Sequence, residues 1–123
     1  MDYYVADAFT DTLFCGNPAG VCVLDRDLPD ALMQRIAAEN NLPETAFVRR
    51  DGAGYALRWF TPTFEIDLCG HATLAAAHVI CTEIEPGREQ VDFWTMSGVL
   101  RVARQGGRYE MAFPNRKPER VEI

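Results

Sequence analysis

Short segments rich in β-branched and aromatic residues recur along the chain, several of them alternating between hydrophobic and polar positions, and they predict β-strands. In order they are YYVADAF, GVCVL, ETAFVRR, YALRWFTP, VDFWTM, VLRVAR and RYEMAF. Two turn sequences predict that neighbouring strands pair as hairpins: DGAG after ETAFVRR, and Ser97-Gly98 after VDFWTM. The hydrophobic pattern therefore predicts six or seven strands.

One segment has the spacing of an amphipathic helix, DLPDALMQRIAAENN. Asp27 is placed to cap this helix, and Pro29 suits its first turn. Its apolar residues fall on one face: Leu32, Met33, Ile36 and Ala37. The helix is therefore expected to cover the sheet on one side.

A second helix is predicted after Gly70, within FEIDLCGHATLAAAHVI (residues 64–80). Apolar residues lie on every side of it, so it is expected to be buried all round. Its alanines would let strands approach the helix axis closely. Together these elements predict an α+β fold, in which a curved, mostly antiparallel sheet wraps around a central buried helix.

Size and composition narrow the function classes. The 123 residues suit one domain, which we expect over residues 1–114, with a linker or tail rich in Pro, Arg, Lys and Glu over residues 115–123. The net charge of −6 argues against nucleic-acid binding. No apolar run approaches the roughly 18 residues of a membrane span, and no signal peptide is recognised. With four cysteines that show no CxxC spacing, this predicts reduced thiols in a cytoplasmic protein without a membrane partner.

The start of the second helix is a candidate anion site. A helix that begins at Gly70 presents the unpaired amides of Gly70, His71 and Ala72 and the positive end of its dipole, which suit a carboxylate or phosphate. His71 could add a hydrogen bond or a proton. The plainer alternative is that Gly70 makes a tight turn and His71 only caps the helix. A zinc site drawn from both histidines, Cys69 and Cys81 lacks a recognised ligand spacing, so no metal is expected.

Cys69 and Glu44 are the candidate proton-transfer groups. Cysteines are most often buried for packing, but a thiol at a helix N-terminus is activated for proton transfer. Glu44, in NLPETAF, is either an ordinary exposed loop residue or a carboxyl group whose apolar surroundings suit it to acid/base catalysis. His78 is expected to pack or to form a hydrogen bond in the core.

Four motifs match one known family together. DAFTDTLFCGNPAGVCVL, NLPETAFV, LRWFTPTFEIDLCGHATLAAA and YEMAFP resemble the N-terminal part of PhzF-like isomerases of phenazine biosynthesis. They occur in the same order and cover the chain from Asp2 to about Pro114. The resemblance implies a diaminopimelate epimerase-like fold, in which two such domains form one chain and the active site lies in the cleft between them.

The resemblance also implies roles for individual residues. Glu44 matches the glutamate that moves a proton within a dihydro-hydroxyanthranilate ring, His71 matches the histidine of the GH motif, and Asn17 matches the asparagine of the GNP turn. Cys69 matches the position of a catalytic cysteine in the related amino-acid epimerases. Because both Glu44 and Cys69 are present, isomerase and epimerase chemistry both stay open.

The family's chains are more than twice as long as 123 residues. We therefore expect either a homodimer or a separate second-domain partner to complete the site. The expected function is a cofactor-independent isomerase acting on a small carboxylated metabolite. Its catalytic residues would be Glu44, His71 and Cys69, and its substrate-binding residues Asn17, Gly70, His71 and Ala72. The alternatives are a catalytically silent domain that binds a small anion, and a purely structural role.

Overall fold

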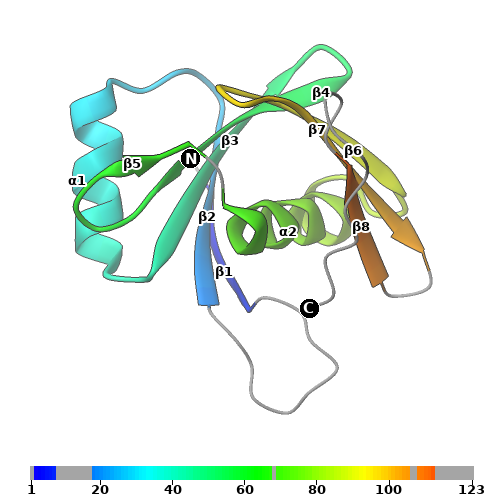
Figure 1. Cartoon of the computed structure of the whole chain (residues 1–123), viewed down its shortest axis with the longest axis horizontal. Helices are drawn as coiled ribbons and strands as arrows, with labels where there is room; N and C mark the ends of the chain where they lie inside the picture. The colour runs from blue at the N-terminus through cyan, green and yellow to red at the C-terminus, as the bar shows by residue number, and fades with distance from the viewer. Residues whose placement is uncertain (1, 8–17, 68, 106–107, 113–123) are drawn as a thin grey trace.

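A computed structural model describes residues 2–7, 18–67, 69–105 and 108–112 of the chain (Figure 1). The described residues form eight strands: β1 (Asp2–Asp7), β2 (Pro18–Leu24), β3 (Glu44–Asp51), β4 (Gly54–Phe60), β5 (Glu65–Ile66), β6 (Gln90–Thr95), β7 (Gly98–Gln105) and β8 (Arg108–Ala112). The helices are α1 (Asp30–Asn40) and α2 (Gly70–Val79), and a π-helical segment (Ile80–Ile84) continues α2. The expected linker over residues 115–123 lies outside the described residues.

All the strands belong to one mixed sheet, in the order β1-β2-β3-β4-β6-β7-β8, with β5 paired to β4. β2 is parallel to β3 and β4 is parallel to β6, whereas the other described neighbours are antiparallel. The α+β class is therefore confirmed, and so is the predicted hairpin of β3 and β4. The two-residue strand β5 was not predicted, because its few residues carry no alternating pattern.

The hairpin of β6 and β7 is confirmed, but its turn consists of Met96 and Ser97 and not of Ser97 and Gly98. Thr95 pairs with Gly98, which begins β7 with a φ of 105°. The buried face sets this register. Its cross-strand pairs are Val91 with Val102 and Phe93 with Leu100, and all four residues are buried. If one strand slipped by one residue, its apolar side chains would turn away from the core.

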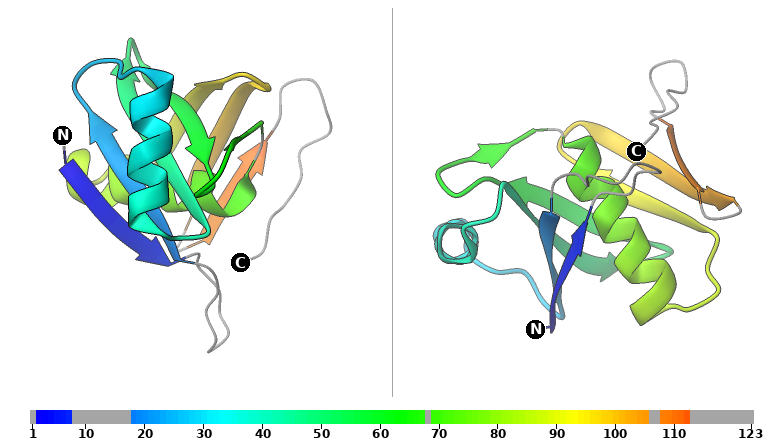
Figure 2. Two further views of the ribbon diagram at one scale, coloured as in Figure 1. Left: turned by 90° about the vertical axis from the view of Figure 1, so that its left-hand side faces the viewer. Right: turned by 90° about the horizontal axis from the view of Figure 1, so that it is seen from below.

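Helix α2 lies against the concave face of the curved sheet (Figures 1 and 2). Buried residues of β2, β3, β4, β6, β7 and β8 form one cluster with it, and four of its alanines are fully buried: Ala72, Ala75, Ala76 and Ala77. The small side chains allow the sheet to approach the helix from several sides. The prediction of a helix buried all round is confirmed.

Helix α1 covers the opposite face of the sheet, over β3 and β4, as its amphipathic pattern predicts (Figure 2). Its buried residues Met33 and Ala37 pack with Phe47 and Phe60 of these strands. The expected cap at Asp27 is wrong. The helix begins three residues later, after Pro29, and the Asp27 carboxylate instead pairs with the Arg49 guanidinium at 2.7 Å.

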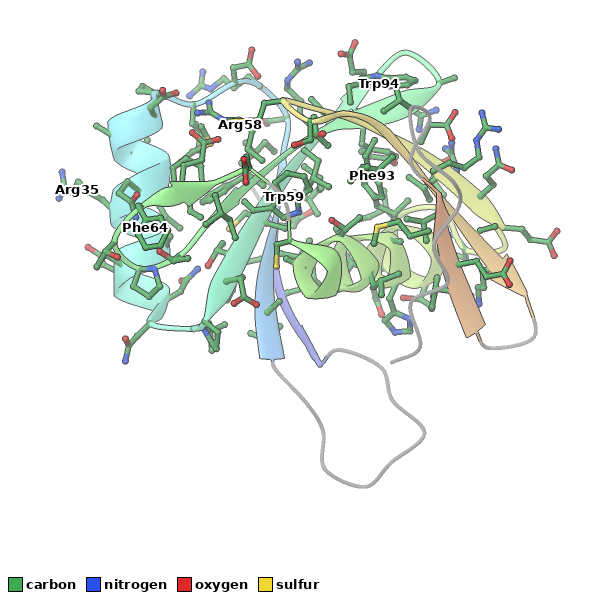
Figure 3. The ribbon with its side chains drawn as sticks, viewed as in Figure 1. Arg35, Arg58, Trp59, Phe64, Phe93 and Trp94 are labelled. Atoms are coloured by element: carbon green, nitrogen blue, oxygen red, sulfur yellow. The ribbon has the colours of Figure 1, made fainter. Side chains whose placement is uncertain are left out.

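Two adjacent residues of β4, Arg58 and Trp59, make contacts on opposite sides of the sheet (Figure 3). On the outer side, the Arg58 guanidinium contacts the carboxylates of Asp30 in the first turn of α1 and Glu65 in β5, each at 2.8 Å. The neighbouring Trp59 side chain belongs to the core cluster around α2. Within the described part of the chain, neither helix is long and apolar enough to cross a membrane.

The contact between β4 and β6 is short, consisting of the pairs Tyr55 with Phe93 and Ala56 with Trp94. Gly54 begins β4 at this junction. A Cβ atom at Gly54 would overlap the backbone carbonyl oxygen of Asp92 and press on the Trp94 ring. Glycine is therefore required here by the close approach of two strands.

Gly54→Ala is expected to lower the free energy of unfolding by about 1–3 kcal/mol, the usual cost of overpacking, because a backbone oxygen cannot move aside. Gly20→Ala is the matched control. Its Cβ would meet the Tyr3 ring at 2.8–3.3 Å, and this partly exposed side chain can rotate away. Urea unfolding of both variants checks this prediction, and equal losses at the two glycines would contradict it.

Candidate functional site

The N-terminus of α2 has the geometry of an anion site. Cys69 precedes the helix in an extended conformation (φ −144°, ψ 108°), and its carbonyl oxygen accepts the Thr73 amide at 3.1 Å. The amides of Gly70, His71 and Ala72 therefore lie in the first turn, where no intrahelical acceptor exists for them. Cys69 and Gly70 are both partly exposed. The positive end of the helix is thus not sealed off by the described residues.

Two hydrogen bonds fix how α2 lies on the sheet. Near its start, the Trp59 indole donates to the Thr73 hydroxyl at 2.9 Å (Figure 3 shows Trp59 beside this end of the helix). Beyond its end, the Tyr55 hydroxyl donates to the Glu85 carboxylate at 2.6 Å. Trp59 and Tyr55 stand near opposite ends of β4, so the start of α2 lies at the Trp59 end of this strand and the residues that follow the helix lie at the Tyr55 end.

Glu44 lies at that same end of the sheet. It is the first residue of β3, where Ala46 pairs with Trp59. Because side chains alternate along a strand, Glu44 shares the α2-facing side with Ala46 and Val48, whereas Phe47 faces α1. It stands about 7 Å along the strand from Ala46. The carboxyl group is therefore directed to the face and end of the sheet where α2 begins.

The Glu44 side chain is unusual in its hydrogen bonding. Its Oε1 atom is buried and has no hydrogen-bond partner among the described residues, although the residue as a whole is partly exposed. A buried carboxylate oxygen without a partner is costly, and each such group in a folded protein calls for an explanation, of which a catalytic role is one. Glu44 is thus a strand residue, partly buried, and not the freely exposed loop residue that was the plainer interpretation.

The structure describes only some of the other predicted site residues. Cys69 and Gly70 lie together at the helix start, and Ala72 is fully buried in the first turn, so it can offer its backbone amide alone. The backbone of His71 is in the first turn, but its side chain lies outside the described part. Asn17 also lies outside the described residues, which begin again at Pro18.

The described cysteines differ in their surroundings. Burial raises the pKa of the Cys22 thiol to about 12 and also raises the pKa of Cys81. Neither group can release a proton readily at neutral pH. Cys69 is more accessible than these two, at the helix start. If a cysteine among the described residues takes part in proton transfer, the geometry favours Cys69.

His78 forms a side-chain hydrogen bond and a packing contact, as predicted. Its Nδ1 lies 3.0 Å from the Tyr109 hydroxyl, and the two rings pack edge to face. Burial lowers the pKa of the imidazole, and the nearby Arg104 lowers it further, which the Glu83 carboxylate partly offsets. The described residues contain no group of three metal-ligating side chains.

Beyond the end of α2, a cluster of polar and charged side chains connects the chain to the sheet. The hydrogen bond from Tyr55, reinforced by Arg88, lowers the pKa of the Glu85 carboxyl group. Burial and this same bond raise the pKa of Tyr55 to about 12. Arg88 contacts Glu85 at 2.8 Å and donates to the Ala53 carbonyl, so the cluster joins the end of the helix to the β3–β4 turn.

Sequence reasoning missed the residues that hold the helix start in place: Trp59, Thr73 and Ser97. The Ser97 hydroxyl donates to the Asp67 carbonyl at 2.6 Å, which ties the loop before α2 to the turn of β6 and β7. Bonds between residues so far apart in the sequence leave no periodic signal. The only sequence clues were polar side chains within apolar surroundings.

Comparison with known proteins gives consistent matches. A family model for phenazine biosynthesis-like proteins, PhzC-PhzF, matches residues 6–123. An uncharacterized isomerase of Halalkalibacterium halodurans is 48% identical over 98% of this chain, which spans 46% of that protein. The crystal structure of a PhzC/PhzF phenazine biosynthesis protein from Clostridium difficile superimposes with a TM-score of 0.85 at 60% identity.

A PhzF-family structure from Enterococcus faecalis gives a TM-score of 0.84 at 52% identity. The chain is covered to 98% by both of these structures and spans 47% and 46% of them, respectively. It thus has about half the length of the relatives that it matches. On the family model, the sequence identity and the shared fold, this chain belongs to the PhzC-PhzF family of phenazine biosynthesis-like proteins.

Proposed function

We propose that this chain carries the N-terminal half of the active site of an isomerase, which moves a proton within a small carboxylated substrate without a cofactor. The observation that carries the proposal is the buried Oε1 of Glu44, which has no hydrogen-bond partner among the described residues and lies at the end of the sheet where α2 presents its first-turn amides. A substrate would supply the partner that this oxygen lacks. Relatives bearing the name isomerase support the reaction class.

The two parts of the site have complementary tasks. The substrate carboxylate binds at the amides of Gly70, His71 and Ala72, where the helix dipole favours a negative charge. Glu44 then removes a proton from carbon and returns it to another position of the same molecule, so the reaction is balanced without a redox partner. His71 and Asn17 add hydrogen bonds to the substrate. A general acid/base of this kind contributes about 10²–10⁴-fold to the rate.

An epimerase-like reaction at Cys69 is the variant of this chemistry that the helix start also supports. Cys69 is partly exposed beside the same amides. In that case the thiol would exchange the proton and Glu44 would only orient the substrate. Binding of an anion without turnover is a further alternative, because the amides bind a carboxylate whether or not a base is present.

The relatives' greater length bears on the rest of the site. We propose that a second half closes over the end of α2, supplied by a second copy in a homodimer or by a separate second domain. This half would contribute the acid/base partner of Glu44. Sedimentation of the chain as a clean monomer at micromolar concentration, with no activity gained by adding a second-domain chain, would contradict this part of the proposal.

Glu44→Gln is expected to lower the rate of solvent-deuterium incorporation into a dihydro-hydroxyanthranilate by about 10²–10⁴-fold, because the amide cannot accept the proton. The urea midpoint should be unchanged, since the two side chains have nearly the same shape. The exchange is followed by proton NMR, with the second half present where activity requires it.

Cys69→Ala separates the two chemistries in the same assay. An isomerase that uses Glu44 should lose much less exchange activity in Cys69→Ala than in Glu44→Gln. An epimerase-like enzyme should show the reverse order. If the wild-type protein exchanges deuterium and both variants exchange at its rate, the catalytic assignment is wrong.

Gly70→Ala tests the anion site independently of catalysis. A Cβ at Gly70 would meet only the Met111 methyl group among the described residues, at an ordinary 3.6 Å, so the fold does not demand glycine here. Stability is expected to stay equal or to rise, because alanine is the better helix former. Phosphate binding, measured by NMR titration, should weaken by about tenfold, equivalent to ~1.4 kcal/mol. Unchanged phosphate affinity would argue against the site.

A further inference from the structure

The Thr73 hydroxyl makes two hydrogen bonds at the start of α2. It accepts the Trp59 indole N–H at 2.9 Å and donates to the Cys69 carbonyl oxygen at 2.7 Å. Thr73 and Trp59 are essentially inaccessible to solvent, at 0% and 1% exposure. The bond between Trp59 and Thr73 is therefore shielded from competition by water, which makes it stronger than the same bond at the surface, whereas the bond to the partly exposed Cys69 is only partly buried.

The donor and acceptor roles in this chain of bonds are fixed by chemistry. An indole N–H can only donate and a carbonyl can only accept, whereas a hydroxyl does both. The oxygen of the Thr73 hydroxyl thus accepts the Trp59 N–H, and the hydrogen of the same hydroxyl is donated to the Cys69 carbonyl oxygen. With the Thr73 amide at 3.1 Å, the carbonyl receives two donors from one residue.

The carbonyl direction determines where the Gly70 amide points. The peptide between Cys69 and Gly70 is trans, so its C=O and N–H point in opposite directions. Holding the carbonyl toward the body of the helix therefore turns the Gly70 N–H outward, away from it. Glycine accepts positive φ values readily, so a peptide that precedes glycine can flip at low cost unless something holds it.

We propose that Thr73, held by Trp59, is a positioning residue that locks the Cys69–Gly70 peptide so that the Gly70 amide faces the substrate carboxylate. This inference rests on the proposed function of the helix start. The hydrogen bonds of Thr73 with Trp59 and Cys69 have a second consequence. Trp59 is paired with Ala46, two residues from Glu44 on the same strand, so the chain of bonds also ties the anion site to the strand that carries the acid/base.

The test compares Thr73→Val, which keeps the shape of the side chain and removes the hydroxyl, with Thr73→Ser, which keeps the hydroxyl. The ¹⁵N-labelled 123-residue chain is titrated with inorganic phosphate at constant ionic strength, and the Gly70 amide is followed by NMR. Thr73→Val is expected to weaken phosphate binding by about tenfold, as a loss of ~1.4 kcal/mol would. Thr73→Ser should stay within about twofold of wild type.

A second readout separates positioning from a general loss of stability. The Gly70 ¹⁵N resonance of the unliganded protein should move in Thr73→Val and not in Thr73→Ser, at a temperature where urea curves show both to be folded. Trp59→Phe, which removes the indole N–H together with part of the buried ring, should give the same shift to a smaller extent. This variant decides the question if Thr73→Val does not fold.

The possible results are distinguishable. If phosphate moves the Gly70 amide of the wild type, and folded Thr73→Val or Trp59→Phe binds it equally well with an unshifted Gly70 resonance, the positioning role is overturned while the anion site stands. If phosphate leaves the wild-type Gly70 amide unmoved, the anion site of the proposed function is overturned, and the positioning role falls with it.

Discussion

The burial of α2 on all sides is the constraint on which the rest of the structure depends. A helix enclosed by a curved sheet must have small side chains wherever strands approach it, and the alanines meet this need. Its middle satisfies its own backbone hydrogen bonds, but its first turn cannot. The unpaired amides must therefore reach the edge of the core. The packing of the fold and the position of the candidate site are consequences of the same buried helix.

The main elements could be predicted because each has a local cause. Apolar residues on every side of the segment after Gly70 predicted a buried helix, and the apolar stripe through Met33 and Ala37 predicted a covering one. The turns that follow β3 and β6 predicted the hairpins. The sequence also singled out Glu44 and Cys69 as candidate proton-transfer groups, and their role stays a prediction. Their assignment to a reaction came from the family resemblance and not from the pattern.

The features that escaped prediction depend on tertiary contacts. The cap of α1 failed at Asp27 because Arg49, on a strand distant in the sequence, offers that carboxylate a salt bridge. The turn of β6 and β7 was displaced by one residue because the buried pairs on the inner face decide the register. The bonds of Thr73 to Trp59 and Cys69 likewise exist only once helix and sheet have met. Side-chain pairs of this kind have no periodic signature.

The short contact between β4 and β6 has a consequence for how the chain folds. β6, β7 and β8 form a local meander, and β3 and β4 form a local hairpin, whereas the β4–β6 contact joins segments between which the whole of α2 lies. Non-local parallel pairing is slow, because a loop must close before any contact forms. The two groups of strands would therefore form first, and α2 would be enclosed when they join. Since its first turn is anchored to Trp59 from one group and its preceding loop to Ser97 from the other, the candidate site would be among the last parts of the molecule to be assembled.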